Sequence, residues 1–335
     1  MFKTKITDML SIDHPILMGG MQWLCRAEFV AAAANAGIMA FLTAETFPSA
    51  GALRDEIREV RRLTKRPFGV NISMLPEVIH EERTLDFARV AAEEKVTAVE
   101  TAGRDPSFLM PVFKEAGVRV LHKVPSLRFA KKAVSAGVDA VIMLGLECGG
   151  HAGMDGVPTL VIIPRAVDEL GVPVIAAGGI ADARGFAAAL ALGAEAVLMG
   201  TRFAATIESP MHENIKKRYV GVTELDTTII MRSIRNPLRC YRNKATEAVL
   251  AMEGRNAPLA EILAIVGGRV GRAAYDSGDA EGAAFPCSLG ASLIHELKPI
   301  HEVVDEIIEG AHRILDGLKG MESAGPSART GGMAS

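Results

Sequence analysis

Short apolar runs alternate with amphipathic segments over the first 200 residues. Between the runs, charged and apolar side chains recur at helical spacing, as in residues 52–63, which predicts helices with one buried face. Several of these helical segments stop at a glycine, the residue best suited to a left-handed helix C-terminus. The strand-like runs are residues 15–18, 38–43, 68–74, 97–101, 118–123, 140–146, 172–177 and 196–199.

Eight strand–helix units predict a parallel sheet, and their number favours closure into a barrel. We therefore assign residues 1–215 to the α/β class, as a TIM (β/α)₈ barrel. An open doubly wound sheet is the competing architecture. Such a sheet, when it binds a dinucleotide, typically has a G-x-G-x-x-G turn after the first strand. The sequence there is Gly19-Gly20-Met21-Gln22-Trp23, which does not supply that turn.

The pattern changes after about residue 215. Residues 214–219, 246–253, 259–266, 268–275 and 303–318 have helical spacing, and no strand is expected between them. We expect an additional C-terminal helical subdomain at 216–299 that covers the active site, and a final helix at about 300–318 that packs back on the barrel. The tail, 321–335, is rich in Gly, Ser and Ala and is expected to be disordered.

The segment 172–203 carries the strongest chemical signal. Its first strand ends at Ala177-Gly178-Gly179, and its second ends at Gly200-Thr201. Two neighbouring parallel strands that end in small residues place backbone N–H groups side by side without a side chain in the way. After the last two strands of a barrel, this arrangement is a phosphate cradle. It predicts a phosphorylated cofactor, and we expect FMN.

Other predicted strand ends are also polar or rich in glycine. The fifth ends in His122-Lys123, and the sixth is followed by the loop 147–153, which contains His151 between glycines. An imidazole in such a loop can approach a substrate and titrates near neutral pH, which suits a general base or a donor to an anion. The alternative is a loop histidine bonded to a carbonyl. No second histidine follows Glu147 and His151 at zinc-ligand spacing, so no metal site is predicted.

Composition restricts the classes of partner. The 335 residues include 37 basic and 40 acidic ones, giving a net charge of −3, and no basic face stands out, so nucleic acid is not an expected partner. The four cysteines are far apart, which favours a reducing, cytoplasmic compartment. The longest apolar stretch is broken by Asn35 and Gly37 and is too short for a membrane span.

Five segments together resemble the nitronate monooxygenase family, formerly called 2-nitropropane dioxygenases. These are HPILMGGMQW, PFGVN, ECGGHAG, IAAGGIADARG and MGTRF. Relatives of the family are the FMN-dependent NADH:quinone reductases and the flavin-containing enoyl-ACP reductase. The resemblance spans nearly the whole chain and includes residues 230–236 (IMRSIRN). The combination of GGMQW with the G-G-H loop is more specific than the two glycine-rich pieces, which many phosphate-binding barrels share.

The resemblance implies an oxidoreductase that holds FMN non-covalently at the barrel mouth. His151 matches the family's catalytic histidine, as a base or a donor that orients an anion. In relatives the Ser73 position is often threonine and the Ala177 position often serine, so one hydroxyl toward FMN is lost here. The positions that match the family's FMN contacts are Gly20, Met21, Gln22, Ser73, Lys123, Gly149, Ala177, Gly178, Gly179, Gly200 and Thr201.

The resemblance leaves several chemistries open. Oxidation of alkyl nitronates with O₂ is the first expectation, and an NAD(P)H:quinone reductase is the alternative to which GGMQW, the loop at 74–76 and IMRSIRN look closest. An FMN-dependent enoyl-ACP reductase, a non-catalytic flavin-binding protein and an IMP dehydrogenase-like enzyme with Cys148 as nucleophile are further alternatives. The partners are then a small-molecule substrate, with NAD(P)H and O₂ as candidate co-substrates. The oligomeric state is open between monomer and homodimer.

Overall fold

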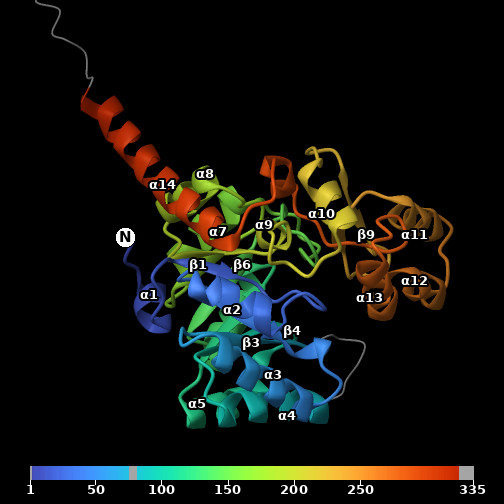
Figure 1. Ribbon diagram of the computed structural model, residues 1–335, viewed down its shortest axis with the longest axis horizontal. Coiled ribbons are helices and arrows are strands. Elements are labelled where there is room, and N and C mark those ends of the chain that lie inside the picture. The colour runs from blue at the N-terminus through green and yellow to red at the C-terminus, as the bar shows by residue number, and fades with distance from the viewer. Residues whose placement is uncertain (1, 75–80, 324–335) are drawn as a thin grey trace, which may run out of the picture.

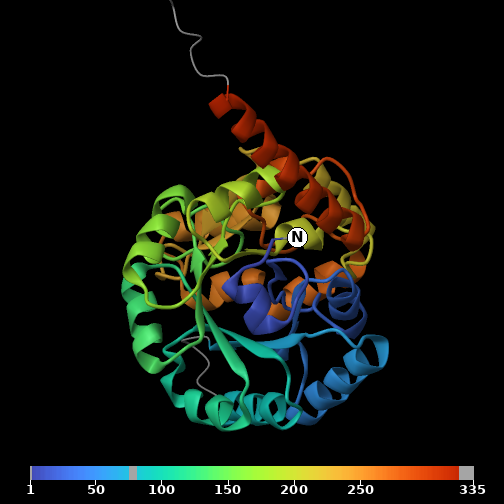
Figure 2. The same ribbon diagram turned by 90° about the vertical axis from the view of Figure 1, so that its left-hand side faces the viewer.

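Eight parallel strands close into a barrel in the computed structural model, which describes residues 2–74 and 81–323. Each strand pairs with its neighbours in sequence, and β1 closes the ring by pairing with β8 (Figures 1 and 2). The predicted TIM barrel is confirmed. The strands are β1 (Ile16–Met18), β2 (Met39–Thr43), β3 (Gly69–Met74), β4 (Ala98–Gly103), β5 (Arg119–Val124), β6 (Ala140–Leu144), β7 (Val174–Ala177) and β8 (Ala196–Met199).

Helices surround the barrel because each has one apolar face. In α3, for example, Leu53, Ile57 and Val60 are buried at helical spacing, and Ser49 caps the first turn by accepting the N–H of Ala52. The helices and short 3₁₀ turns of this part are α1 (Lys5–Leu10), α2 (Ala27–Asn35), η1 (Ala44–Thr46), α3 (Ala50–Leu63), α4 (Glu81–Glu93), η2 (Pro106–Phe108), α5 (Met110–Ala116), α6 (Leu127–Ala136), α7 (Thr159–Glu169), α8 (Ala183–Ala191) and α9 (Thr201–Ala204).

Two details of the helices differ from the sequence expectation. Helix α1 was not expected. Helical spacing indicates a helix over residues 164–170, but helix α7 begins earlier, at Thr159, and contains Pro164. The carboxylate of Glu147 accepts the N–H of Thr159 at 3.0 Å and so fixes the earlier start.

Alternation along the strands separates two cores. Side chains such as Leu17, Phe41 and Leu121 point inward and form the barrel interior, while the alternate residues pack against the helices. The same alternation turns Glu100 inward after Ala98, and Lys123 inward after Leu121. Polar groups therefore form the upper layer of the interior at β4 and β5.

The expectation that no strand follows the barrel is wrong. Strands β9 (Thr227–Ile230) and β10 (Leu238–Tyr241) form an antiparallel pair. Isolated bridges join Gly150 to Arg239 and Cys240 to Pro286, so the pair is anchored to the loop after β6. The remaining elements are α10 (Glu213–Val220), α11 (Lys244–Gly254), α12 (Leu259–Val266), α13 (Gly268–Ser277), η3 (Leu289–Leu293) and α14 (Ile300–Ser323).

The final helix returns to the barrel. Helix α14 packs on α8 and α2, and its C-terminal part projects beyond them (Figures 1 and 2). It runs to Ser323, so the tail expected at 321–335 begins inside the helix, and residues 324–335 lie outside the described part. None of the helices in the described ranges has the length and apolar character needed to cross a membrane.

Candidate active site

The glycines after β7 and β8 differ in what surrounds them. Gly178 and Gly179 have φ values of +122° and +70°, a region that favours glycine. A Cβ on Gly178 would lie 2.8 Å from Oγ1 of Thr159. Gly200, in contrast, has a negative φ, and a Cβ there would meet only Met21, with its Sδ at 3.7 Å. Space is therefore available in front of Gly200, whereas Gly178 is required by the fold itself.

Helix α13 lies against the loop that follows β1. A Cβ on Gly268, the first residue of α13, would lie 3.5 Å from Oε1 of Gln22. The guanidinium of Arg272, one turn further on, lies 5.3 Å from the ring centre of Trp23. The loop is also fixed by the barrel, because the backbone N–H of Trp23 donates to Oγ1 of Thr46. The C-terminal helices thus contact the residues that precede β2 at the barrel mouth.

A buried ion pair forms the floor of the mouth. Glu100 is completely buried, accepts the N–H of Gly20 at 2.8 Å, and is paired with the ammonium of Lys123. The amide of Asn71 donates to the carbonyl of Glu100 at 3.3 Å, and a Cβ on Gly20 would collide with the Asn71 side chain. The resemblance implies Lys123 as an FMN contact. In the structure its charge is balanced by Glu100, an ion pair that was not predicted.

The histidine loop lies under the β9–β10 pair. Gly150 and Arg239 exchange backbone hydrogen bonds of 3.0 and 2.8 Å. The imidazole of His151 is exposed, with Nδ1 at 3.3 Å from the carbonyl oxygen of Pro237. Gly149 lies against the backbone of Cys287 and Ser288, where a Cβ would come within 2.7 Å. The loop is therefore held by its backbone, and the imidazole is left accessible.

Cys148 does not have the properties of a nucleophile. Burial raises the pKa of its thiol to about 12, so the thiolate is scarce at neutral pH. This disfavours the IMP dehydrogenase-like alternative.

A segment that we did not predict covers the cradle. The hydroxyl of Thr201 accepts the N–H of Ser288 at 3.1 Å, and Oγ of Ser288 accepts the N–H of Gly290 at 3.1 Å. Gly290 lies so close to Gly179 that a Cβ would be 2.6 Å from its carbonyl oxygen. Residues 287–290 thus join β7 and β8 at the mouth. Their sequence, CSLG, forms no motif that indicates this contact.

Glu45 is a second residue that the sequence analysis missed. It lies in η1, directly after β2, and its Oε1 accepts the N–H of Ser73 at 2.8 Å. Its other oxygen, Oε2, is buried and has no hydrogen-bond partner among the described residues. Burial raises the pKa of Glu45 to about 7. The signal in the sequence was a glutamate two residues after a fully buried strand.

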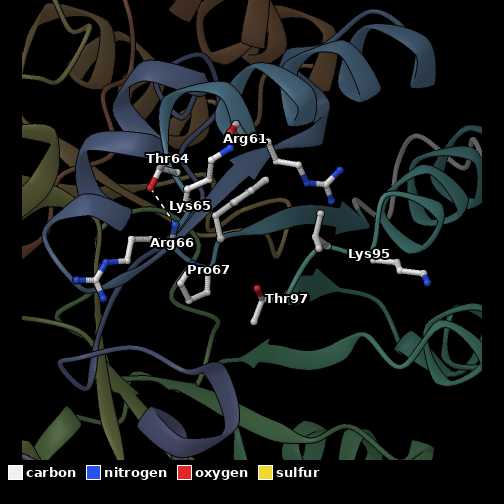
Figure 3. A pocket seen from close by; sticks show the side chains of 9 residues that line it. Arg61, Thr64, Lys65, Arg66, Pro67, Lys95 and Thr97 are labelled. Carbon is white, nitrogen blue, oxygen red and sulfur yellow. Dashed lines mark hydrogen bonds between the residues drawn. The ribbon is translucent and has the colours of Figure 1, made fainter.

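A separate surface depression lies at the opposite end of the barrel, at the start of β3 and β4 (Figure 3). Its basic side chains are largely engaged, because Arg61 pairs with Glu94 and Arg66 pairs with Asp13. This end of a barrel contributes to stability, while catalysis occurs at the carboxyl ends of the strands. We therefore place the candidate site at the mouth.

The nitronate monooxygenase family model matches residues 3–310 of this chain. The chain belongs to that family. It is 29% identical over 291 residues to a probable nitronate monooxygenase of Staphylococcus aureus, an alignment that covers 75% of this chain and 82% of the relative. This membership confirms the resemblance drawn from sequence and makes the protein an oxidoreductase of the nitronate monooxygenase family.

Three further proteins are similar to this chain, two of them with a higher sequence identity than 29%. A (3aS,4S,5R,7aS)-5-hydroxy-7a-methyl-1-oxo-octahydro-1H-indene-4-carboxyl-CoA dehydrogenase of Rhodococcus jostii is 37% identical, over 68% of this chain and 62% of the relative. The structure of FabK from Thermotoga maritima has a TM-score of 0.88 at 36% identity and covers 96% of this chain and all of that one. A nitroalkane oxidase from Streptomyces ansochromogenes has a TM-score of 0.79 at 26% identity, over 93% of this chain and 99% of that one. The family's members thus carry names from more than one chemistry.

Proposed function

We propose that this protein is an FMN-dependent oxidoreductase with its reaction centre at the barrel mouth. The observation that carries the proposal is the space in front of Gly200, beside the left-handed Gly178-Gly179 turn. Backbone N–H groups without side chains favour an anionic group there, as a flavin phosphate requires. When bound, FMN would supply the electron and hydride transfer that protein side chains lack.

The residues that would hold FMN follow or end several different strands at the barrel mouth. Ala177 is the last residue of β7 and brings a methyl group where a hydroxyl would offer a hydrogen bond. Lys123 and Glu100 together present a neutral pair, so this pair exerts little net charge on a bound ring. The proposed contacts are Gly20, Met21, Gln22, Ser73, Lys123, Gly149, Ala177, Gly178, Gly179, Gly200 and Thr201.

We propose His151 as the residue that handles a proton beside the substrate. Its loop is fixed by Gly150 and Arg239 while the imidazole is exposed. A planar, conjugated anion fits this chemistry, because it forms when a carbon acid next to an electron-withdrawing group loses a proton. Alkyl nitronates are such anions, and their oxidation with O₂ is the first candidate activity, supported by the family model.

A second candidate is chemistry on an acyl thioester. The observation that favours it is sequence identity. The relative named as a carboxyl-CoA dehydrogenase is 37% identical to this chain, whereas the probable nitronate monooxygenase is 29% identical. An enolate of a thioester is also a planar conjugated anion, so the same histidine would serve. Residues of the substrate-facing loops, and not the cradle, would then decide between the two activities.

Anaerobic mixing distinguishes these activities. The purified protein is first denatured to identify the released flavin, for which we expect FMN. The holoprotein is then mixed without O₂ with an alkyl nitronate, NADH or NADPH while the flavin spectrum is followed. Bleaching by the nitronate alone supports the first activity. Bleaching by NAD(P)H, followed by reoxidation with an enoyl thioester or a quinone, identifies a reductase, and release of FAD or of no flavin contradicts the cofactor proposal.

A further inference from the structure

Glu45 has the placement of a ligand-contact residue. Strand β2 ends at Thr43, so Glu45 lies at the carboxyl end of the barrel, where the candidate site is. In the closed ring of eight strands, β2 is four strands from β6 in either direction. Glu45 and His151, which follows β6, therefore lie on opposite sides of the mouth.

Only one of the two carboxyl oxygens of Glu45 has a hydrogen-bond partner among the described residues. Oε1 is fixed by the N–H of Ser73, but Oε2 is buried without a partner among the described residues. A buried polar atom left unpaired is costly, and such atoms are rare in native proteins. The side chain as a whole keeps part of its surface accessible, and the terminal torsion of a glutamate is soft. A small rotation can therefore present Oε2 to a bound molecule.

Burial favours the neutral carboxylic acid form of Glu45. The charged groups near Glu45 are Arg83 of α4 and Glu100 of β4. Arg83 donates to the carbonyl of Phe47, and Glu100 is already paired with Lys123 of β5. Burial therefore outweighs the attraction of Arg83 and keeps the proton on Glu45 up to about pH 7. A protonated carboxyl group has an O–H to donate, and no acceptor for it lies within residues 2–74 and 81–323.

We propose that Glu45 contacts the substrate as a neutral carboxylic acid that donates a hydrogen bond to one oxygen of a planar oxyanion. This proposal deepens the proposed function, since it rests on an anionic ligand at the mouth. His151 and Glu45 then hold the anion from opposite sides. When Glu45 loses its proton, it loses the donor and gains a negative charge, so anion binding must weaken for both reasons.

The first test measures the protonation state directly and needs no turnover. Infrared difference spectra of the wild type and Glu45→Gln, recorded across pH, isolate the C=O band of a protonated carboxyl group. We expect that band to disappear with a midpoint near pH 7 in the wild type. Glu56→Gln is the matched control, because Glu56 is also half-buried and accepts a backbone N–H, from Ala27 at 2.8 Å. A band that disappears near pH 4–5 would overturn the proposal.

The second test uses benzoate, an unreactive planar carboxylate, as the probe. We expect its affinity for the wild type to fall about tenfold per pH unit above pH 7, as one lost proton requires. In Glu45→Gln, whose amide can still donate, the affinity should persist and that pH dependence should vanish; Glu56→Gln should behave as wild type. Equal pH dependence in wild type and Glu45→Gln would refute the contact. If the protein binds benzoate in this way yet releases no FMN, the proposed function fails and the Glu45 proposal stands.

Discussion

At the scale of single residues, Gly178 and Gly200 have different roles: we expect Gly178 to be needed for folding and Gly200 for cofactor binding. Valine at Gly178 would need φ near +122° and would crowd Thr159, so we expect Gly178→Val to lower the free energy of unfolding by more than about 1 kcal/mol. Gly200→Val meets only Met21 in the protein, so the apoprotein should keep its stability and lose FMN. Thermal unfolding of the apoprotein and FMN bound per chain measure the two effects.

Gly171→Val is the control for these glycines, because nothing lies within 4 Å of a Cβ at that position. It should change neither stability nor FMN content. Full FMN occupancy in Gly200→Val would show that the phosphate binds elsewhere.

The ion pair of Lys123 and Glu100 calls for a double-mutant cycle. Lys123→Met leaves the fully buried carboxylate of Glu100 without its partner, which typically costs about 3–5 kcal/mol. Adding Glu100→Gln removes that charge, so the double variant should be more stable than Lys123→Met alone. Chemical denaturation of the apoproteins measures this. A double variant no more stable than the single one would show that packing of the lysine, and not its charge, matters.

His151 should contribute to turnover more than to folding. Its imidazole is exposed and lies 3.3 Å from the carbonyl oxygen of Pro237, so little apolar surface is lost on substitution, and His151→Asn should lower the free energy of unfolding by less than about 1 kcal/mol. The rate should fall about 10²–10⁴-fold, as is typical for a positioned acid–base group. A neutral nitroalkane, which needs C–H proton removal, should be affected more than its preformed nitronate if His151 is a base. His301→Asn, an exposed histidine of α14, is the control.

The residues predicted from sequence were those whose role is local. The glycine turns after β7 and β8 and the glycine-flanked His151 are short motifs, and the structure places them all at the carboxyl end of the barrel. Glu45 and Ser288 were missed because their partners lie 28 and 87 residues away in sequence. No spacing rule reports such contacts, so the polar half of the site required the fold.

At the scale of elements, the burial and composition of a strand, and not its length, decided whether it could be predicted. The barrel strands are largely buried on both faces, and most of them appear as predominantly apolar runs. Strands β9 and β10 have four residues each, are only partly buried, and contain polar side chains such as Arg239. Their stability comes from pairing with each other and from the bridge of Arg239 to Gly150. Periodicity does not detect such a pair.

The loop between β9 and β10 offers a test of the two substrate classes. Met231 and Arg235 adopt positive φ values of 62° and 59°, and Glu253 fixes the loop by accepting the N–H groups of Met231 and Ser233. Arg232 and Arg235 are exposed and have no ion-pair partner in the described part of the chain. Because Pro237 contacts His151, these arginines lie on the candidate active-site side.

If a CoA thioester is the substrate, the double change Arg232→Gln and Arg235→Gln should raise KM for it, with a salt dependence weaker than that of the wild type. A short thioester without phosphates, and an alkyl nitronate, should be unaffected. Arg313→Gln on α14 serves as the control. Unchanged KM for the CoA thioester would remove the loop from substrate binding.

At the scale of the whole molecule, two buried groups oppose each other in the pH dependence of stability. Burial raises the pKa of Glu45 from 4.5 to about 7 and lowers the pKa of His122 from 6.5 to about 4. The folded protein therefore holds the proton of Glu45 more tightly than the unfolded chain, so this stabilisation is lost as pH rises from 4.5 to 7. His122 is neutral when folded, so its stabilisation is lost as pH falls from 6.5 to 4.

Each contribution is of the order of 3 kcal/mol, so the two nearly cancel in the wild type between about pH 4.5 and 6.5. In Glu45→Gln only the contribution of His122 to the pH dependence of stability remains. This variant should therefore become less stable, relative to wild type, as pH falls. His122→Asn should show the opposite slope and lose stability as pH rises. Urea unfolding of the apoproteins at several pH values measures both, and the difference from wild type cancels the other titrating groups. Parallel curves for wild type and either variant would mean that the corresponding group keeps an ordinary pKa in the folded barrel.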